Sequence, residues 1–508
     1  SSSEFDYLRT FRECSENMDS LSEEVASLIR DLCYFSRAQT GSKLLSADLL
    51  DPTVFSSVID TIDDILEHAD IKLDEVAGID TSKRSYKLRD IVDKDRVMYA
   101  NTLNLDKPQE NFDTPVDNER DAPHVPILWG KPNSIVPLQK SINNTSHIYE
   151  AEMRMLDYET LLGEESVPRE PFSFPTACAE HPFEYIDTEA ALQALADILK
   201  ANNYSEIAID LENHSYRSFL GFSCLMQLST RDKDYVIDTV ALRAHMGLLL
   251  DVFTDPHVVK VFHGCHNDIL WLQRDFGLYV VNCLDTYQAS KLLKYPALSL
   301  AHLLKYYCGI TVNKKHQLAD WRQRPLSAEL MQYARDDTHY LLYIFDCLRR
   351  DIVREHGMSG LCAVFDASRR TCLMRYEKDQ FDRLGYLQLF QDPRRNVYKI
   401  RAAELTATQD SILMCLWDWR DRHARESDES PAYIMSDSEL VRLGMLPQLP
   451  RSADELAKAG QPLSGYVMQR LDAVLKVIHD AVHGGPASSG GPLNDTASAS
   501  KKTAPSAS

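Results

Sequence analysis

The chain has 508 residues, of which 44% are hydrophobic and 26% are charged, so it is long enough for several globular domains. This composition excludes a fully disordered chain and a disulfide-stapled miniprotein, and the formal net charge of −21 argues against a protein that coats nucleic acid through bulk charge. The sequence holds no apolar run of 18 residues, so we expect no membrane span, and its 11 cysteines without a CxxC pair favour a reducing compartment.

Residues 1–105 are predicted to be helical, because apolar residues recur there at spacings of three and four. This region is open to two interpretations, an ordinary helical bundle and a module that binds a partner. Residues 106–181 are rich in proline, which predicts an extended connector. A segment of this length either is disordered or lies along a neighbouring domain, and Trp129 and Tyr149 favour the second alternative.

Short strands alternate with helices from residue 182 onward, which predicts an α/β domain. The expected strands are 184–187, 207–212, 224–229, 235–237 and 258–262, of which the third and fourth form a hairpin. The expected helices are 190–199, 266–276, 299–308 and 327–350. Residues 405–483 are predicted to be helical again, and residues 484–508 to form a disordered tail.

Two carboxylates occupy alternate positions of one predicted strand, in Asp210-Leu211-Glu212. Side chains at i and i+2 of a strand point to the same face, so the repulsion between these two acids favours a divalent cation. Strand ends are often acidic, however, so the pair alone is weak support for a metal site.

Two further elements carry candidate groups. Asp268 lies in the first turn of the helix predicted at 266–276, where a helix dipole would also favour an acid. Tyr333 and Asp337 lie four residues apart on one helical face, where they could place a water and a metal ion. The alternative for that helix is a solvated surface carrying Asp336 and Asp337.

In combination, the four carboxylates and the tyrosine resemble the DEDD-Y exonuclease family. Segments similar to the ribonuclease D branch of this family are 214–219, 225–229, 317–322 and 336–340. More narrowly, the chain resembles the exosome-associated 3′-to-5′ exoribonucleases. Residues 1–105 are similar to the partner-binding N-terminal domain of that group, residues 123–132 to its connector and residues 405–483 to an HRDC domain.

This resemblance implies a ribonuclease-H-like exonuclease domain over residues 182–400, with a mixed sheet flanked by helices. The implied reaction is hydrolysis of the 3′-terminal phosphodiester of RNA, which releases nucleoside 5′-monophosphates one at a time.

The resemblance also implies the roles of the five site residues. Asp210, Glu212, Asp268 and Asp337 would hold two divalent cations, Mg²⁺ or Mn²⁺. Tyr333 would orient the attacking water by a hydrogen bond.

Contacts to the substrate are expected at three residues. His214 could contact a phosphate or sugar, and Trp271 could either stack on a terminal base or belong to the core. Arg322 follows a loop that contains Lys314 and Lys315, and these cations could either form a basic rim or be solvated.

The expected partners are single-stranded RNA 3′ ends, the nuclear RNA exosome core and a small helical protein bound to residues 1–105, with no membrane contact. The expected location is the nucleus, including the nucleolus. Two other functions remain open, a scaffold that docks the helical partner and the exosome, and a DNA exonuclease.

Overall fold

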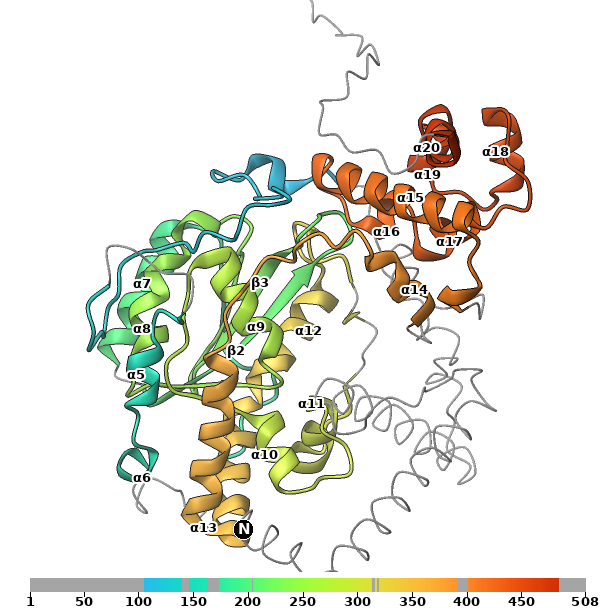
Figure 1. The fold of residues 1–508 in the computed structure, drawn as a ribbon. Coiled ribbons are helices and arrows are strands. Elements are labelled where there is room, and N and C mark those ends of the chain that lie inside the picture. The colour runs from blue at the N-terminus through green and yellow to red at the C-terminus, as the bar shows by residue number, and fades with distance from the viewer. Residues whose placement is uncertain are drawn as a thin grey trace, which may run out of the picture.

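The computed structural model describes residues 105–138, 146–162, 173–202, 204–312, 316–317, 319–391 and 401–483. The helices predicted within residues 1–104, the tail at 484–508 and the pair Lys314 and Lys315 lie outside the described residues. Within the described part, an α/β domain is followed by a helical domain (Figure 1). No helix among the described residues is both long enough and apolar enough to cross a membrane.

A mixed sheet of six strands, ordered β1-β4-β3-β2-β5-β6, forms the centre of the α/β domain. Strand β3 is antiparallel to β2 and β4, and the other pairs are parallel. The strands are β1 (Phe183–Ile186), β2 (Glu206–His214), β3 (Phe222–Ser229), β4 (Asp234–Ile237), β5 (Val259–Phe262) and β6 (Cys283–Asp285). The sheet and its flanking helices confirm the predicted fold class. The structure also contains β6, which was not predicted because its three residues are too few to show apolar alternation.

Helices pack on both faces of this sheet (Figure 1). They are α7 (Glu189–Ala201), α8 (Leu250–Thr254), α9 (His266–Trp271), α10 (Thr286–Leu292), α11 (Leu300–Leu303), α12 (Ala328–His339) and α13 (Leu341–Cys372). The single helix predicted at 327–350 is therefore two helices. The second runs far beyond residue 350, with an interruption at Gly357, whose φ of 67° is left-handed.

The helical domain that follows contains α15 (Ala407–Glu426) as its longest helix. Before and after it lie α14 (Gln388–Gln391), α16 (Pro431–Ile434), α17 (Asp437–Gly444), α18 (Ala453–Ala459), α19 (Gly465–Met468) and α20 (Leu471–His483). These helices share one apolar core that is separate from the cores of the α/β domain.

The described part of the predicted connector lies against the α/β domain. Trp129 Nε1 donates to the carbonyl of Phe276 at 2.6 Å, and Asn133 Nδ2 donates to the carbonyl of Asp251 at 2.8 Å. Tyr149 is fully buried in the core on one face of the sheet. Two short helices, α5 (Glu150–Arg154) and α6 (Tyr158–Leu161), interrupt the extended path. These contacts agree with the alternative in which the connector follows a neighbouring domain.

Strand β2 directs alternate side chains into different surroundings. Ile207, Ile209 and Leu211 join the core on the face covered by α7 and α8. Ala208 joins the core on the opposite face, together with residues of α13. Asp210 and Glu212 continue the Ala208 series, so the packing of β2 sends both carboxylates to one face of the sheet.

Candidate active site

Three of the predicted ligands converge on that face. The carboxylate oxygens of Asp210 and Glu212 on β2 and of Asp337 on α12 all lie within 4.8 Å of one another. Helix α12 is held over the sheet by a hydrogen bond of 2.8 Å between Thr338 Oγ1 and Ser229 Oγ of β3. The structure therefore brings together acids that are more than 120 residues apart in sequence, as the motif predicts.

Asp268 and Tyr333 border the same cluster. Asp268 lies in the first turn of α9, is 7% exposed, and is one of the charges that raise the pKa of Glu212. Tyr333 lies one helical turn before Asp337, and its ring centroid is 5.9 Å from that of Trp321. Burial, and then the charges of Asp337 and Glu212, raise the pKa of the Tyr333 phenol, so its hydroxyl stays protonated and can donate.

The electrostatics of the cluster fit a divalent cation. Burial raises the pKa of Asp210 to about 7, and burial followed by neighbouring acids raises the pKa values of Glu212 and Asp337 far above the ordinary range. No lysine or arginine of the described residues is among the groups that set these pKa values. Oxygen donors of this kind suit hard cations such as Mg²⁺ and Mn²⁺.

The loop that leads into α9 is fixed by a residue that the sequence analysis missed. Asp285 caps α10 by accepting from the backbone N–H of Tyr287 at 2.9 Å. Its carboxylate also accepts from the backbone N–H of Gly264 at 2.7 Å. Asp285 thereby places the turn that precedes Asp268. An acid just before a helical segment is a capping signal that the sequence does contain.

The structure argues against the expected substrate contact at His214. This side chain is 3% exposed, its Nε2 accepts from the backbone N–H of Arg217 at 3.0 Å, and its Nδ1 lies 3.5 Å from Asp320. Its Nε2 therefore fixes the loop after β2, its Nδ1 faces Asp320, and the ring is withdrawn from the surface.

Arg322 is also directed inward, against the expectation of a basic rim. It is 5% exposed, and its Nε and Nη2 donate to the carboxylate of Asp320 at 2.9 and 2.7 Å. The ion pair with Asp320 holds the guanidinium in the interior. Trp271 is half-buried and packs against the core, so base stacking there stays a prediction.

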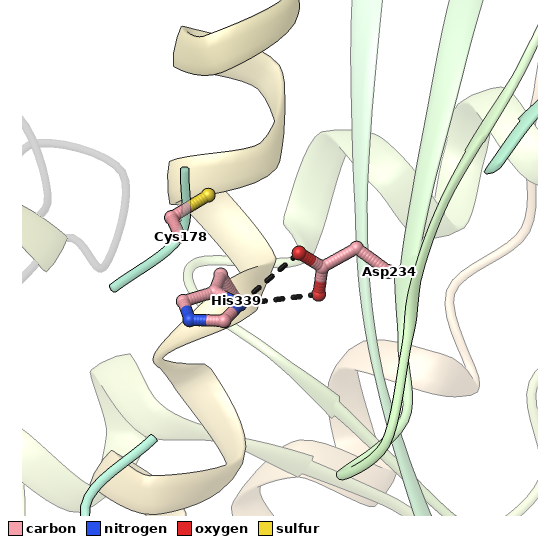
Figure 2. Close-up of side chains that lie close together, drawn as sticks. All are labelled: Cys178, Asp234 and His339. Atoms are coloured by element: carbon pink, nitrogen blue, oxygen red, sulfur yellow. Dashed lines mark hydrogen bonds and ion pairs between the residues drawn. The ribbon is translucent and has the colours of Figure 1, made fainter. Parts of the chain in front are cut away.

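A second cluster could be mistaken for a metal site, namely Cys178, Asp234 and His339, whose ligand atoms also lie within 4.8 Å of one another (Figure 2). His339 Nδ1 lies 3.0 Å from Asp234, and Nε2 lies 2.9 Å from the carbonyl of Thr176. Both ring nitrogens already face acceptors within the protein, so neither is directed at an open position for a metal. Burial raises the pKa of the Cys178 thiol to about 12, which leaves it protonated.

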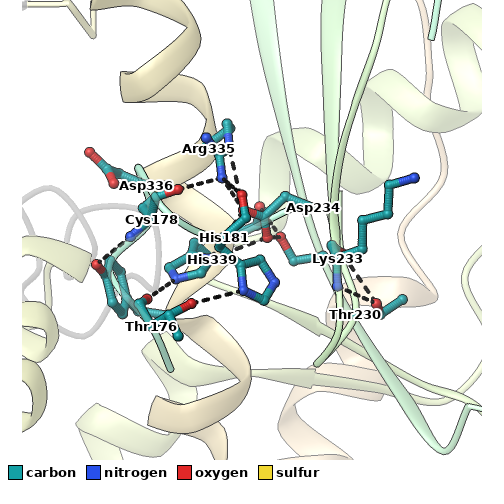
Figure 3. A network of polar contacts seen from close by, with 12 residues as sticks. Thr176, Cys178, His181, Thr230, Lys233, Asp234, Arg335, Asp336 and His339 are labelled. Carbon is teal, nitrogen blue, oxygen red and sulfur yellow. Dashed lines mark hydrogen bonds and ion pairs between the residues drawn. The ribbon is translucent and has the colours of Figure 1, made fainter. Parts of the chain in front are cut away.

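The wider network shows what this cluster does instead (Figure 3). Arg335 Nη2 donates to Asp234 at 3.0 Å and to the carbonyl of His181 at 2.9 Å. Burial alone would raise the pKa of Asp234, but hydrogen bonds from His339, Ser229 and Arg335 hold it below the ordinary value. The network ties α12, which carries Tyr333 and Asp337, to β4.

Comparisons with known proteins give the same domain order. Residues 183–353 match a family model described as a 3′-5′ exonuclease. Residues 1–78 match the NUC016 domain, and residues 409–478 match the HRDC domain.

Two relatives and one crystal structure share about a third of the residues. Exosome complex exonuclease RRP6 of Saccharomyces cerevisiae is 33% identical over 94% of this chain and 65% of that protein. Exosome complex component 10 of Homo sapiens is 34% identical over 84% of this chain and 53% of that protein. The catalytic core of RRP6 from Trypanosoma brucei superposes with a TM-score of 0.65 at 34% identity, covering 75% of this chain and 99% of that one. The chain thus spans between 53% and 65% of the length of these two relatives.

Proposed function

Because this chain belongs to the RRP6 family of exosome exonucleases, we propose that it is a 3′-to-5′ exoribonuclease. The observation that carries the proposal is the convergence of Asp210, Glu212 and Asp337 within 4.8 Å, inside the segment that matches the exonuclease model. The proposed reaction hydrolyses the last phosphodiester bond of an RNA strand and releases a nucleoside 5′-monophosphate.

Asp210, Glu212, Asp268 and Asp337 would hold two divalent cations, Mg²⁺ or Mn²⁺, which when bound lower the pKa of the attacking water and stabilise charge on the leaving 3′ oxygen. Tyr333 would donate its hydroxyl hydrogen bond to the attacking water and orient it toward the phosphorus. The rigid placement of the acids, two on one strand and one on a helix packed over that strand, supports this preorganised arrangement.

The proposed partners follow from the relatives, whose names place them in the exosome complex. We therefore propose that the chain acts on single-stranded RNA 3′ ends together with the exosome core. A small helical protein on residues 1–105 and a location in the nucleus and nucleolus remain predictions. A preference for RNA over DNA requires contacts to the 2′-hydroxyl.

A gel time course on 5′-labelled single-stranded RNA and on DNA of the same sequence tests the proposal. We expect a ladder on RNA with Mg²⁺ that is lost in EDTA and in the Asp210→Asn variant. The control is Asp232→Asn, which changes an exposed acid of the same domain and should leave the ladder intact. A ladder on DNA alone would favour a DNA exonuclease. A folded protein that gives no ladder would favour the scaffold.

A further inference from the structure

Gln227, at the centre of β3, is a buried polar residue whose amide is not explained by any hydrogen bond within the described part of the chain. Its side chain is 0% exposed, and within the described ranges neither Oε1 nor Nε2 has a hydrogen-bond partner. Burying an unpaired amide costs free energy, and the great majority of buried polar groups in proteins are paired. Gln227 belongs to the segment 225–229 that is similar to the ribonuclease D branch, yet no step of the proposed reaction uses it.

The register of the sheet places Gln227 beside the candidate metal site. In the antiparallel pair of β2 and β3, Gln227 lies directly opposite Asp210. Directly opposite residues project to the same face with Cβ atoms about 4.5–5.5 Å apart, which a glutamine side chain can bridge to a carboxylate. Two residues further along β3, Ser229 is bonded to Thr338 of α12. The amide therefore lies between the strand that supplies Asp210 and the helix that supplies Asp337.

Packing does not explain the amide. Two neighbours on the same face, Leu225 on β3 and Val236 on β4, are apolar and belong to one hydrophobic cluster, and a third, Ser229, is already bonded to Asp234 and Thr338. A leucine or methionine at position 227 would fill this place without leaving a polar group unpaired. In the register of the sheet, the group opposite Gln227 that an amide N–H can serve and a hydrocarbon cannot is the carboxylate of Asp210.

We propose that Gln227 is a positioning residue of the metal site: its Nε2, which has no partner among the described residues, turns to donate to the carboxylate of Asp210 when a divalent cation is bound and fixes the orientation of that ligand. This inference rests on the metal site of the proposed function. An uncharged donor suits the task, because it orients a carboxylate without competing with the cation. Residues that orient metal ligands in this way typically contribute about 10–100-fold to metal affinity.

Calorimetric titration of the full chain with Mn²⁺, without RNA, tests this role in the Gln227→Met and Gln227→Leu variants. We expect Mn²⁺ to bind at least about 10-fold more weakly in both variants than in the wild type. The melting temperature in EDTA should be unchanged or higher, because the unpaired buried amide is gone. This combination is specific, since a residue that only supports the fold would lower the melting temperature.

Thr239→Val is the matched control, because Thr239 is also fully buried and its hydroxyl donates to the carbonyl of Ser223, on the same strand as Gln227, at 3.0 Å, away from the candidate ligands. It should lower the melting temperature and leave the affinity for Mn²⁺ unchanged. Wild-type affinity in both Gln227 variants would overturn the inference, and so would loss of the folded state, because the amide would then serve the fold. A wild-type protein that binds no Mn²⁺ would instead overturn the metal site itself.

Discussion

The acids of the candidate site oppose folding of the metal-free protein at neutral pH. Asp210 has an ordinary pKa of 3.8, which burial raises to about 7 in the folded chain. Between these two values the unfolded chain has lost a proton that the folded chain retains. The contribution of Asp210 to stability is therefore complete below about pH 4 and is lost as the pH rises toward 7.

Replacing this acid should stabilise the metal-free protein. We predict that Asp210→Asn raises the free energy of unfolding in EDTA at pH 7.5 by about 1–3 kcal/mol, because one pKa unit corresponds to about 1.4 kcal/mol. The difference should shrink as the pH falls toward 4. Melting curves in EDTA between pH 4 and 8 measure this effect. A variant that melts below the wild type at pH 7.5 would contradict the electrostatic account.

Part of the candidate site could be predicted from the sequence alone. Period two in a strand and period four in a helix correctly placed Asp210, Glu212 and Asp337 on facing surfaces. The inward orientation of His214 and Arg322 could not be predicted in this way. Both side chains contact Asp320, and such a contact leaves no periodic pattern in the sequence. The position of Gln227 depends on the register between two strands, which the sequence of either strand does not contain.

At the scale of elements, the orientation of α12 decides whether Asp337 and Tyr333 reach the strand acids. Strands β1 to β5 begin and end within two residues of their predicted bounds, because apolar alternation marks them. The break between α12 and α13 was not predicted, since residues 327–350 contain no glycine or proline at that point. The polar network around Asp234 holds the C-terminal end of α12 in place.

Asp234→Asn should therefore weaken the fold and the site together. The amide would leave Arg335 and His339 without their anion in the interior, and breaking a buried ion pair in this way typically costs about 3–5 kcal/mol. We expect a lower melting temperature and a lower rate on RNA. The control is Asp232→Asn, an exposed neighbour that should shift stability by less than about 0.5 kcal/mol. Equal melting temperatures for the two variants would mean that the network is not required.

At the scale of the whole molecule, three segments meet at the loop that follows Glu212. Arg217 in this loop makes two hydrogen bonds to Glu429 of the HRDC domain, at 2.8 and 2.7 Å. Lys107 of the connector reaches the same carboxylate at 2.9 Å. Asp428 accepts from the backbone N–H of Phe219 at 2.9 Å. The HRDC domain and the connector thus support the loop that continues the strand bearing two candidate ligands.

Residues 1–105 should be dispensable for the chemical step, because the described site is built from β2, α9 and α12. We predict that deleting them leaves the rate on a short single-stranded RNA within about twofold of the full chain, a free-energy change below about 0.5 kcal/mol. A single-turnover time course measures this rate. A tenfold fall would place that region in the active site and contradict its predicted role as a partner module.

Replacing Glu429, unlike deleting residues 1–105, should lower the rate on RNA. Glu429→Ala would leave Arg217 and Lys107 facing each other without the carboxylate that both contact, and two such cations repel in a region of low exposure. We expect the HRDC domain to separate from the exonuclease domain, so that the radius of gyration from small-angle X-ray scattering rises and the rate on RNA falls. Glu426→Ala is the matched control, because Glu426 is an exposed acid three residues earlier in the same domain. If Glu429→Ala kept both the radius and the rate of this control, the loop after β2 would hold its position without the HRDC domain.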